Sequence, residues 1–306
     1  MSLDRSILRE KLGPYFQYYT EQCQIVYQSR KAALPLKKHS DVVAIASDIT
    51  TGLPRSKVKE SLATRYAVLG CPTDEALDAC IDLVVRLVFM LHVGEFRHTF
   101  IRCWGPAWTT GSLCDFMRRE FPSKPSIIHH GVKLHRGFDV CNMVRIAGFK
   151  IELTADLFQH LRLRDDRSVT IFHHAWFLKS QRQSSLFPDG LIDETLETLA
   201  LLFPQGKRNV RKWYNSQLTP GDLDEAVLNC GTAHRRIERY KYWHDRLVEL
   251  KEEFDEARPS TLSQWWNDRR EGTQCYTLWV ALTFTLLFGL IQTVVGILQL
   301  YKAYYP

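Results

Sequence analysis

Histidine is the residue type in this sequence whose spacing could place ligands around a metal ion. Zinc sites bring three or four ligands together, usually from short-spaced pairs backed by carboxylates. The candidates lie between residues 129 and 174: His129, His130, His135, His160, His173 and His174. They contain no short-spaced pair of the zinc-binding kind, so packed or exposed histidines are favoured and no metal ligand is assigned. On a predicted strand 168–177, neighbouring residues point to opposite faces, so we expect one of His173 and His174 inside and one outside.

The sequence has none of the common motifs of a catalytic nucleophile or a phosphate-binding loop. G-x-S-x-G, G-x-x-x-x-G-K, G-x-G-x-x-G and H-E-x-x-H are all absent. Asp165 and Asp166 lie beside Arg162, Arg164 and Arg167, a pattern typical of a solvated, salt-linked turn. Enzyme activity therefore stays uncertain, leaning toward none, with no catalytic or cofactor-binding residue assigned and no cofactor expected.

Composition restricts the compartment and the partners. The eight cysteines are scattered without a C-x-x-C pair, as in reduced cytosolic proteins rather than disulfide frameworks or zinc sites. The net charge is +6, from 40 Lys and Arg against 34 Asp and Glu, with the two signs interspersed. Nucleic-acid binding usually requires a clustered basic face, so no nucleic-acid partner is expected. A mild positive excess suits a protein beside anionic lipid headgroups.

An uncharged apolar segment near the C-terminus is the strongest signal in the sequence. Residues 272–301 contain no charged side chain, and residues 276–301 are mostly aliphatic or aromatic. As a helix, 276–301 would extend roughly 39 Å, enough to cross a hydrocarbon core of about 30 Å. Lipid cannot satisfy backbone donors, so a lone span must be helical. The segment predicts one transmembrane helix with the lipid bilayer as partner, and a buried core helix is the less favoured alternative.

Aromatic and basic side chains flank this segment, as they do at the two surfaces of a bilayer. They are Trp265, Trp266, Arg269, Arg270, Tyr276 and Trp279 on one side, and Tyr301, Lys302 and Tyr304 on the other. Basic residues are more frequent before the span, which predicts a cytosolic N-terminal part. Residues 1–16 lack the apolar core of a signal peptide, so we expect a single-pass, tail-anchored protein. The long span and sparsely basic tail favour the endoplasmic reticulum over the mitochondrial outer membrane.

Small and polar residues share one face of the predicted span. This association face consists of Thr285, Gly289, Gln292, Thr293, Gly296 and Gln299. Small residues let two helices approach closely, and a glutamine within lipid gains from a hydrogen bond to a partner. The face predicts a homo-oligomer formed through the transmembrane helix. The alternative is that the glutamines are tolerated without a partner.

The rest of the chain has the pattern of a mainly α protein with a small β component, an α+β fold. Residues 1–34 predict an N-terminal segment of two helices, interrupted at Gly13-Pro14 and restarting at Cys23. Residues 35–220 predict a cytosolic globular domain, whose most apolar helix, 73–91, should lie in the core. Residues 221–259 predict a long charged connector helix over 222–257. Residues 260–306 predict the membrane-interface segment and the transmembrane tail anchor.

Within the globular domain, capping residues and periodicity predict the individual elements. The expected helices are 42–49, 54–69, 73–91, 110–121, 138–147, 155–161 and 191–203; the expected strands are 149–153 and 168–177; and 181–222 is the expected loop region around helix 191–203. Three helices followed by short strands suggest winged-helix-like parts.

Several stretches resemble an uncharacterised family of filamentous-fungal proteins that end in a single transmembrane helix. The likeness is carried by WWNDRR at 265–270, YTLWVA at 276–281, FGLIQ at 288–292 and YKAY at 301–304, with further stretches at 145–148, 154–161, 172–178, 199–206 and 243–250. The resemblance implies a membrane-tethered protein with one span. It implies no activity, cofactor or substrate.

These patterns lead to one preferred hypothesis of function and two alternatives. The preferred one is a tail-anchored membrane protein that presents a helical, non-catalytic domain for protein–protein interaction with an unknown cytosolic partner. The alternatives are a membrane-tethered enzyme with its site in residues 93–180 and a tethered winged-helix-like binding module. A pocket of converging titratable side chains would favour the enzyme. A flat apolar or aromatic patch would favour binding.

Overall fold

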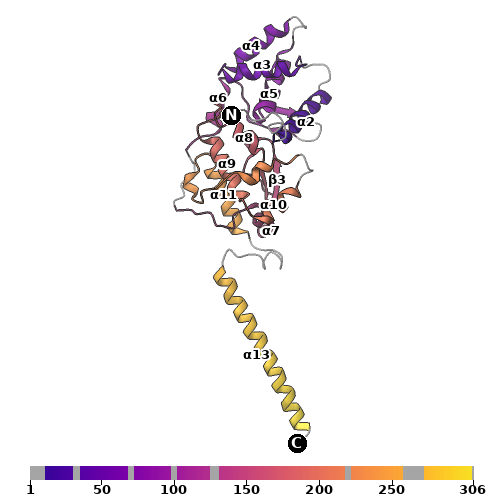
Figure 1. The fold of residues 1–306 in the computed structure, drawn as a ribbon, viewed down its shortest axis with the longest axis vertical. Coiled ribbons are helices and arrows are strands. Elements are labelled where there is room, and N and C mark those ends of the chain that lie inside the picture. Colours follow the sequence, from indigo (N-terminus) through magenta and orange to yellow (C-terminus); the bar gives the residue numbers. More distant parts are fainter. Residues whose placement is uncertain are drawn as a thin grey trace. The chain divides into compact units, whose positions relative to one another are not determined.

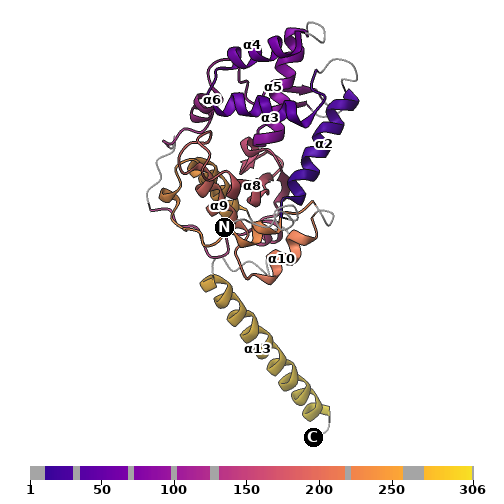
Figure 2. The ribbon, with the colours of Figure 1, turned by 45° about the horizontal axis from the view of Figure 1, so that its top comes forward.

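The computed structural model describes residues 11–29, 35–67, 72–97, 102–124, 131–217, 222–257 and 272–304. The chain forms two compact units, Met1–Ala257 and Arg258–Pro306. Helices dominate the first unit, which also holds two small sheets, and the second contains one long apolar helix (Figures 1 and 2). The predicted class, mainly α with a small β component and an apolar C-terminal helix, is confirmed.

The N-terminal part of the first unit is a helical layer built around α5 (Asp74–Phe89). Helices α3 (His39–Thr50) and α4 (Arg55–Tyr66) both pack against α5 (Figure 2). The Thr73 hydroxyl caps α5 by accepting the Ala76 N–H, and a left-handed Met90 ends it. Most apolar side chains of α5 are buried, and Val88 is half-buried, so its wide apolar face predicted its central position correctly.

Helix α2 (Gly13–Ser29) begins at the predicted interruption at Gly13-Pro14, but it corrects the expected restart at Cys23. Pro14 lies in the first turn, where a missing N–H leaves no helix bond unmade. The helix then continues past Cys23 without a break. Its tyrosines fix it to the end of α5, because the Tyr15 hydroxyl donates to the Leu87 carbonyl at 3.0 Å and that of Tyr18 donates to Arg86 at 3.2 Å.

The middle of the unit holds the strands. An antiparallel pair, β1 (Glu95–Arg97) and β2 (Arg102–Trp104), is followed by α6 (Leu113–Glu120) and α7 (Val140–Arg145). A three-stranded sheet then has the order β3-β5-β4, with β3 (Lys150–Thr154) parallel to β5 (Ser168–Phe172) and β4 (Arg162–Leu163) antiparallel to it. The central strand β5 is buried along its whole length.

Two elements of this region differ from expectation. The predicted helix 155–161 is only a 3-10 turn, η2 (Leu157–Gln159), since Asp156 caps Phe158 and Leu161 is left-handed. The predicted strand 168–177 ends at Phe172, because the chain turns into α8 (Ala175–Ser180). His173 and His174 therefore lie in a turn, and both are buried; the expectation of one inward and one outward histidine was wrong.

The C-terminal part of the first unit corrects the predicted connector helix 222–257. Three separate elements occupy this range: η3 (Glu225–Asn229), η4 (Ile237–Arg239) and α11 (His244–Glu256). Gly231, with φ of +97°, lies between the first two in a conformation that suits glycine and that a helix excludes. Helix α11 buries Leu247, Leu250 and Phe254, so it belongs to the core of the unit. Before it lie α9 (Leu191–Leu202), as predicted, and α10 (Arg208–Asn215), within the predicted loop region.

Candidate functional site

The long helix of the second unit, α13 (Gly272–Tyr304), has the properties of a membrane span. Its segment Trp279–Tyr304 has a mean hydropathy of 2.1, and none of its most apolar window is buried in the described structure. At about 1.5 Å per residue these 26 residues extend roughly 39 Å. A helix of this length and composition could cross the hydrocarbon core of a bilayer.

The predicted interface residues fall near the two ends of this helix where the structure describes them. Trp279, Tyr301, Lys302 and Tyr304 lie on α13, as does the backbone of Tyr276. Trp279 and Tyr301 are separated by roughly 33 Å of helix rise, which matches two interfacial belts. Trp265, Trp266, Arg269 and Arg270 lie outside the described residues.

The association face lies on one side of α13. At about 100° per residue, its six members fall within an arc of roughly 120°. The hydroxyls of Thr285 and Thr293 donate to the carbonyls of Ala281 and Gly289 at 2.9 and 2.8 Å, so the helix itself satisfies them. In the described part of the chain, the amides of Gln292 and Gln299 have no hydrogen-bond partner. Gln292 lies near the middle of Trp279–Tyr304 and is the more deeply placed of the two.

Gly289 and Gly296 are not required by the conformation of a single copy. A Cβ atom built at either position meets no atom within 4 Å, and neither residue has a positive φ. Glycine in the middle of a helix costs roughly 0.5–1 kcal/mol relative to alanine. The feature that glycine offers here is a smooth surface for another helix to approach.

The described histidines among the metal-site candidates do not form one cluster: His160, His173 and His174 are buried, whereas His135 is exposed. His160 Nδ1 accepts the Phe172 N–H at 3.1 Å, so its Nε2 carries the proton and donates to the Thr198 hydroxyl at 2.7 Å. Burial lowers the pKa of His160 well below its usual range and that of His173 to about 4. No group of three or more His, Cys, Asp or Glu within the described residues could hold a metal ion. His129 and His130 lie outside those residues.

A second buried polar group joins α2 to the start of η2. The Tyr18 hydroxyl lies 3.1 Å from His92 Nε2, and the Asp156 carboxylate accepts the His92 main-chain N–H at 3.1 Å. Burial raises the pKa of Asp156 to about 6 and lowers that of His92 to about 3. The described structure thus pairs each of these side chains with another group of the same unit.

Comparisons with protein-family models, curated proteins and solved structures found no match. The geometry of the chain is therefore the basis for assigning its function. The likeness to the filamentous-fungal family remains an expectation from the sequence.

Proposed function

We propose that this protein is a single-pass, tail-anchored membrane protein in which α13 spans a bilayer and the unit Met1–Ala257 interacts with a protein partner. The observation that carries the proposal is the exposure of the apolar side chains of α13. Phe284, Phe288 and Leu290 are each more than half exposed. Side chains of this kind are costly in water and stable in hydrocarbon.

The distribution of Lys and Arg around the span supports a direction of insertion. Arginines at 258, 269 and 270 precede the span, whereas Lys302 follows it. Positive residues are retained on the cytoplasmic side of a membrane. We therefore place Met1–Ala257 in the cytosol and the residues after α13 across the membrane, with the endoplasmic reticulum favoured over the mitochondrial outer membrane.

A glycosylation reporter tests this arrangement. The natural sequence contains no Asn-X-Ser/Thr acceptor, so an acceptor added after Pro306 through a short spacer is the single one in the chain. Glycosylation in cells indicates that the C-terminus reaches the lumen of the endoplasmic reticulum. Integral membrane association without glycosylation would contradict either the proposed membrane or the proposed direction.

We further propose that two or more copies associate through α13. Thr285, Gln292 and Gln299 recur every seven residues, and Gly289 and Gly296 repeat with the same period. A seven-residue repeat with alternating steps of three and four forms a left-handed helix pair. Copies inserted in the same direction are parallel, so the Gln292 side chains of two copies face each other near the bilayer centre. Each amide can then form a hydrogen bond with the amide of the other copy.

A further inference from the structure

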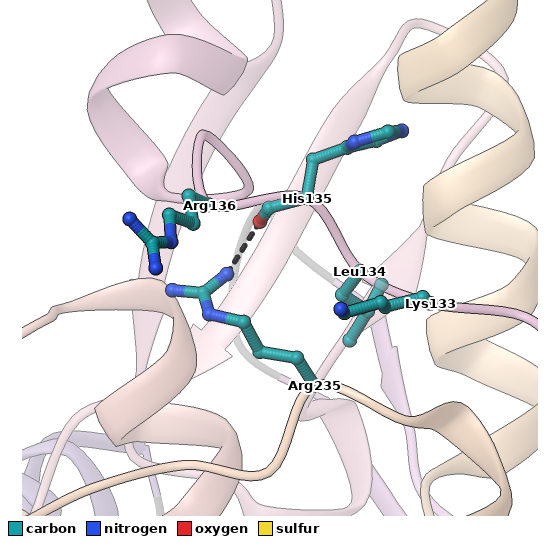
Figure 3. Close-up of a pocket in the computed structure, with 5 residues that line it drawn as sticks. All are labelled: Lys133, Leu134, His135, Arg136 and Arg235. Atoms are coloured by element: carbon teal, nitrogen blue, oxygen red, sulfur yellow. Dashed lines mark hydrogen bonds between the residues drawn. The ribbon is translucent and has the colours of Figure 1, made fainter.

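Three of the five residues that line a cavity in the first unit are Lys or Arg. Its volume is about 490 Å³, within the range of small-molecule sites. Figure 3 shows its lining: Lys133, Leu134, His135, Arg136 and Arg235. Lys and Arg carry full positive charge at neutral pH, and no carboxylate lines the cavity.

The cavity has a frame of main-chain hydrogen bonds between two segments that are distant in sequence. The Leu134 N–H donates to the Arg235 carbonyl at 2.7 Å, and Lys133 and Arg236 form an antiparallel bridge. Ile237 N–H donates to the Val132 carbonyl at 3.1 Å. Leu134 is 1% exposed and anchors this frame in the core. The basic side chains therefore start from fixed backbone positions.

Arg235 has a defined orientation within this frame. Its guanidinium donates to the carbonyl of His135 (Figure 3). The figure also shows the imidazole of His135 pointing away from the guanidinium of Arg235. His135 thus contributes a carbonyl that positions an arginine, and the ligand-binding groups are the three cations.

The acidic groups near the cavity form their described contacts with other groups than these cations. In the described chain, none of Lys133, Arg136 and Arg235 forms an ion pair. Asp139 is paired with Lys207 at 2.8 Å, and the Glu238 carboxylate accepts the Gly131 N–H at 2.6 Å. Lys207 also donates to the Arg136 carbonyl at 3.2 Å, which fixes the main chain at this side of the cavity.

We propose that this cavity binds a phosphorylated small molecule or headgroup through Lys133, Arg136 and Arg235. Three cations match the charge of a phosphomonoester, about −1.5 to −2 at neutral pH, better than the single charge of a carboxylate. The planar fork of arginine forms paired hydrogen bonds with phosphate oxygens. The phosphate can belong to a phosphoinositide lipid or to a soluble inositol phosphate, since both present the same group.

Calorimetric titration of the full-length protein in detergent micelles with inositol 1,4,5-trisphosphate tests the site. We expect saturable binding that Lys133→Ala/Arg136→Ala weakens at least about tenfold, because two charge-assisted contacts are lost. Lys133→Arg/Arg136→Lys retains both charges and should stay within about threefold of the parent. Both side chains are exposed at the surface, so an unchanged unfolding midpoint is expected and checks the fold.

Arg118→Ala/Arg119→Ala on α6 is the matched control, because it removes the same charge from exposed positions outside the cavity. It should bind the ligand like the parent. The proposal is overturned if the parent shows no saturable binding, if Lys133→Ala/Arg136→Ala binds like the parent, or if the control loses as much affinity.

A competition experiment distinguishes the two sources of phosphate. The full-length protein is placed in phosphatidylcholine nanodiscs with or without phosphatidylinositol 4,5-bisphosphate, and binding of the soluble trisphosphate is measured in each. Displacement by the lipid supports the site and assigns it to a membrane headgroup. Equal binding in both discs supports the site and assigns it to a soluble ligand.

Discussion

The carboxylate of Glu194, on α9, accepts the main-chain N–H of Trp243 at 2.8 Å. The N–H groups of Lys241 and Tyr242 donate to the same carboxylate, also at 2.8 Å. Three consecutive amides are thus bonded to one side chain and unavailable to carbonyls four residues back. These bonds interrupt helical pairing directly before α11, which begins at His244, so the predicted helix 222–257 is broken here as well as at Gly231.

Replacing Glu194 with Gln tests how much these three hydrogen bonds contribute to the free energy of unfolding. Burial raises the pKa of Glu194, which means that the charged carboxylate itself costs some folding free energy. The neutral Glu194→Gln variant avoids this cost, but it places an NH₂ donor opposite main-chain N–H donors. An unpaired buried donor costs about 1–3 kcal/mol, and we expect Glu194→Gln to lose that much stability. Thermal unfolding of the full-length protein in micelles, followed by tryptophan fluorescence, measures it. Exposed Glu249→Gln is the control, and equal stability of both variants would refute the argument.

The neutral state of His160 predicts a specific dependence on pH. Burial holds its folded pKa well below the ordinary value near 6.5, so the unfolded chain binds the extra proton. The stability linked to this group is present above about pH 6.5 and is lost as the pH falls below it. His160→Gln removes the titration while keeping a donor for Thr198.

The difference in unfolding free energy between the parent and His160→Gln should therefore shrink by about 1.4 kcal/mol per pH unit from pH 6 to 5. Denaturant unfolding at a series of pH values measures this slope. His135→Gln changes an exposed histidine and should follow the parent curve. A difference that stays constant across this range would show that His160 is not buried in its neutral form.

Arg55 joins α4 to α5 through two carboxylates. Its guanidinium Nη2 lies 2.9 Å from Asp78 Oδ1, and Nη1 lies 2.7 Å from Asp82 Oδ1. The Arg55 side chain is 9% exposed. Removing one partner of a fully buried pair costs about 3–5 kcal/mol. Asp78 is 40% exposed, so we expect about 2–3 kcal/mol for Arg55→Ala.

The matched comparison for Arg55 is Arg65→Ala on the same helix. Arg65 contacts Asp48 at 3.4 Å from a more exposed position, so we expect a loss of at most about 1 kcal/mol. Unfolding midpoints of both variants measure the contrast. Similar losses would mean that burial of Arg55 adds nothing to the interaction.

Gln292 is predicted to stabilise association of α13. Hydrogen bonds between membrane helices contribute roughly 0.6–1.7 kcal/mol, so Gln292→Leu should weaken association about 3- to 20-fold. Energy transfer between labelled full-length copies in liposomes measures it. Val294→Leu lies about 200° around the helix from Gln292 and should have no effect. Equal association of Gln292→Leu and the parent would remove the proposal.

The sequence predicted the features that arise from local patterns. The wide apolar face of α5 and the uncharged run of α13 each depend on neighbouring residues, and the structure reproduces them. Features that depend on distant contacts were missed. Nothing near Trp243 in sequence indicates that Glu194 binds its N–H, and Arg235 approaches His135 only because the chain pairs Lys133 with Arg236. The basic residues of both segments were visible in the sequence, but their convergence was not.

Alkaline carbonate extraction with protease protection is the most direct test of the central claim that α13 anchors the protein in a membrane. Sealed membranes carrying the full-length chain are compared with those carrying a chain truncated after Gln274. We expect the full-length protein to stay in the pellet, with Met1–Ala257 digested from outside, and the truncated protein to be extracted. Extraction of the full-length protein as freely as the truncated one would contradict the claim and would make α13 a helix that packs against protein.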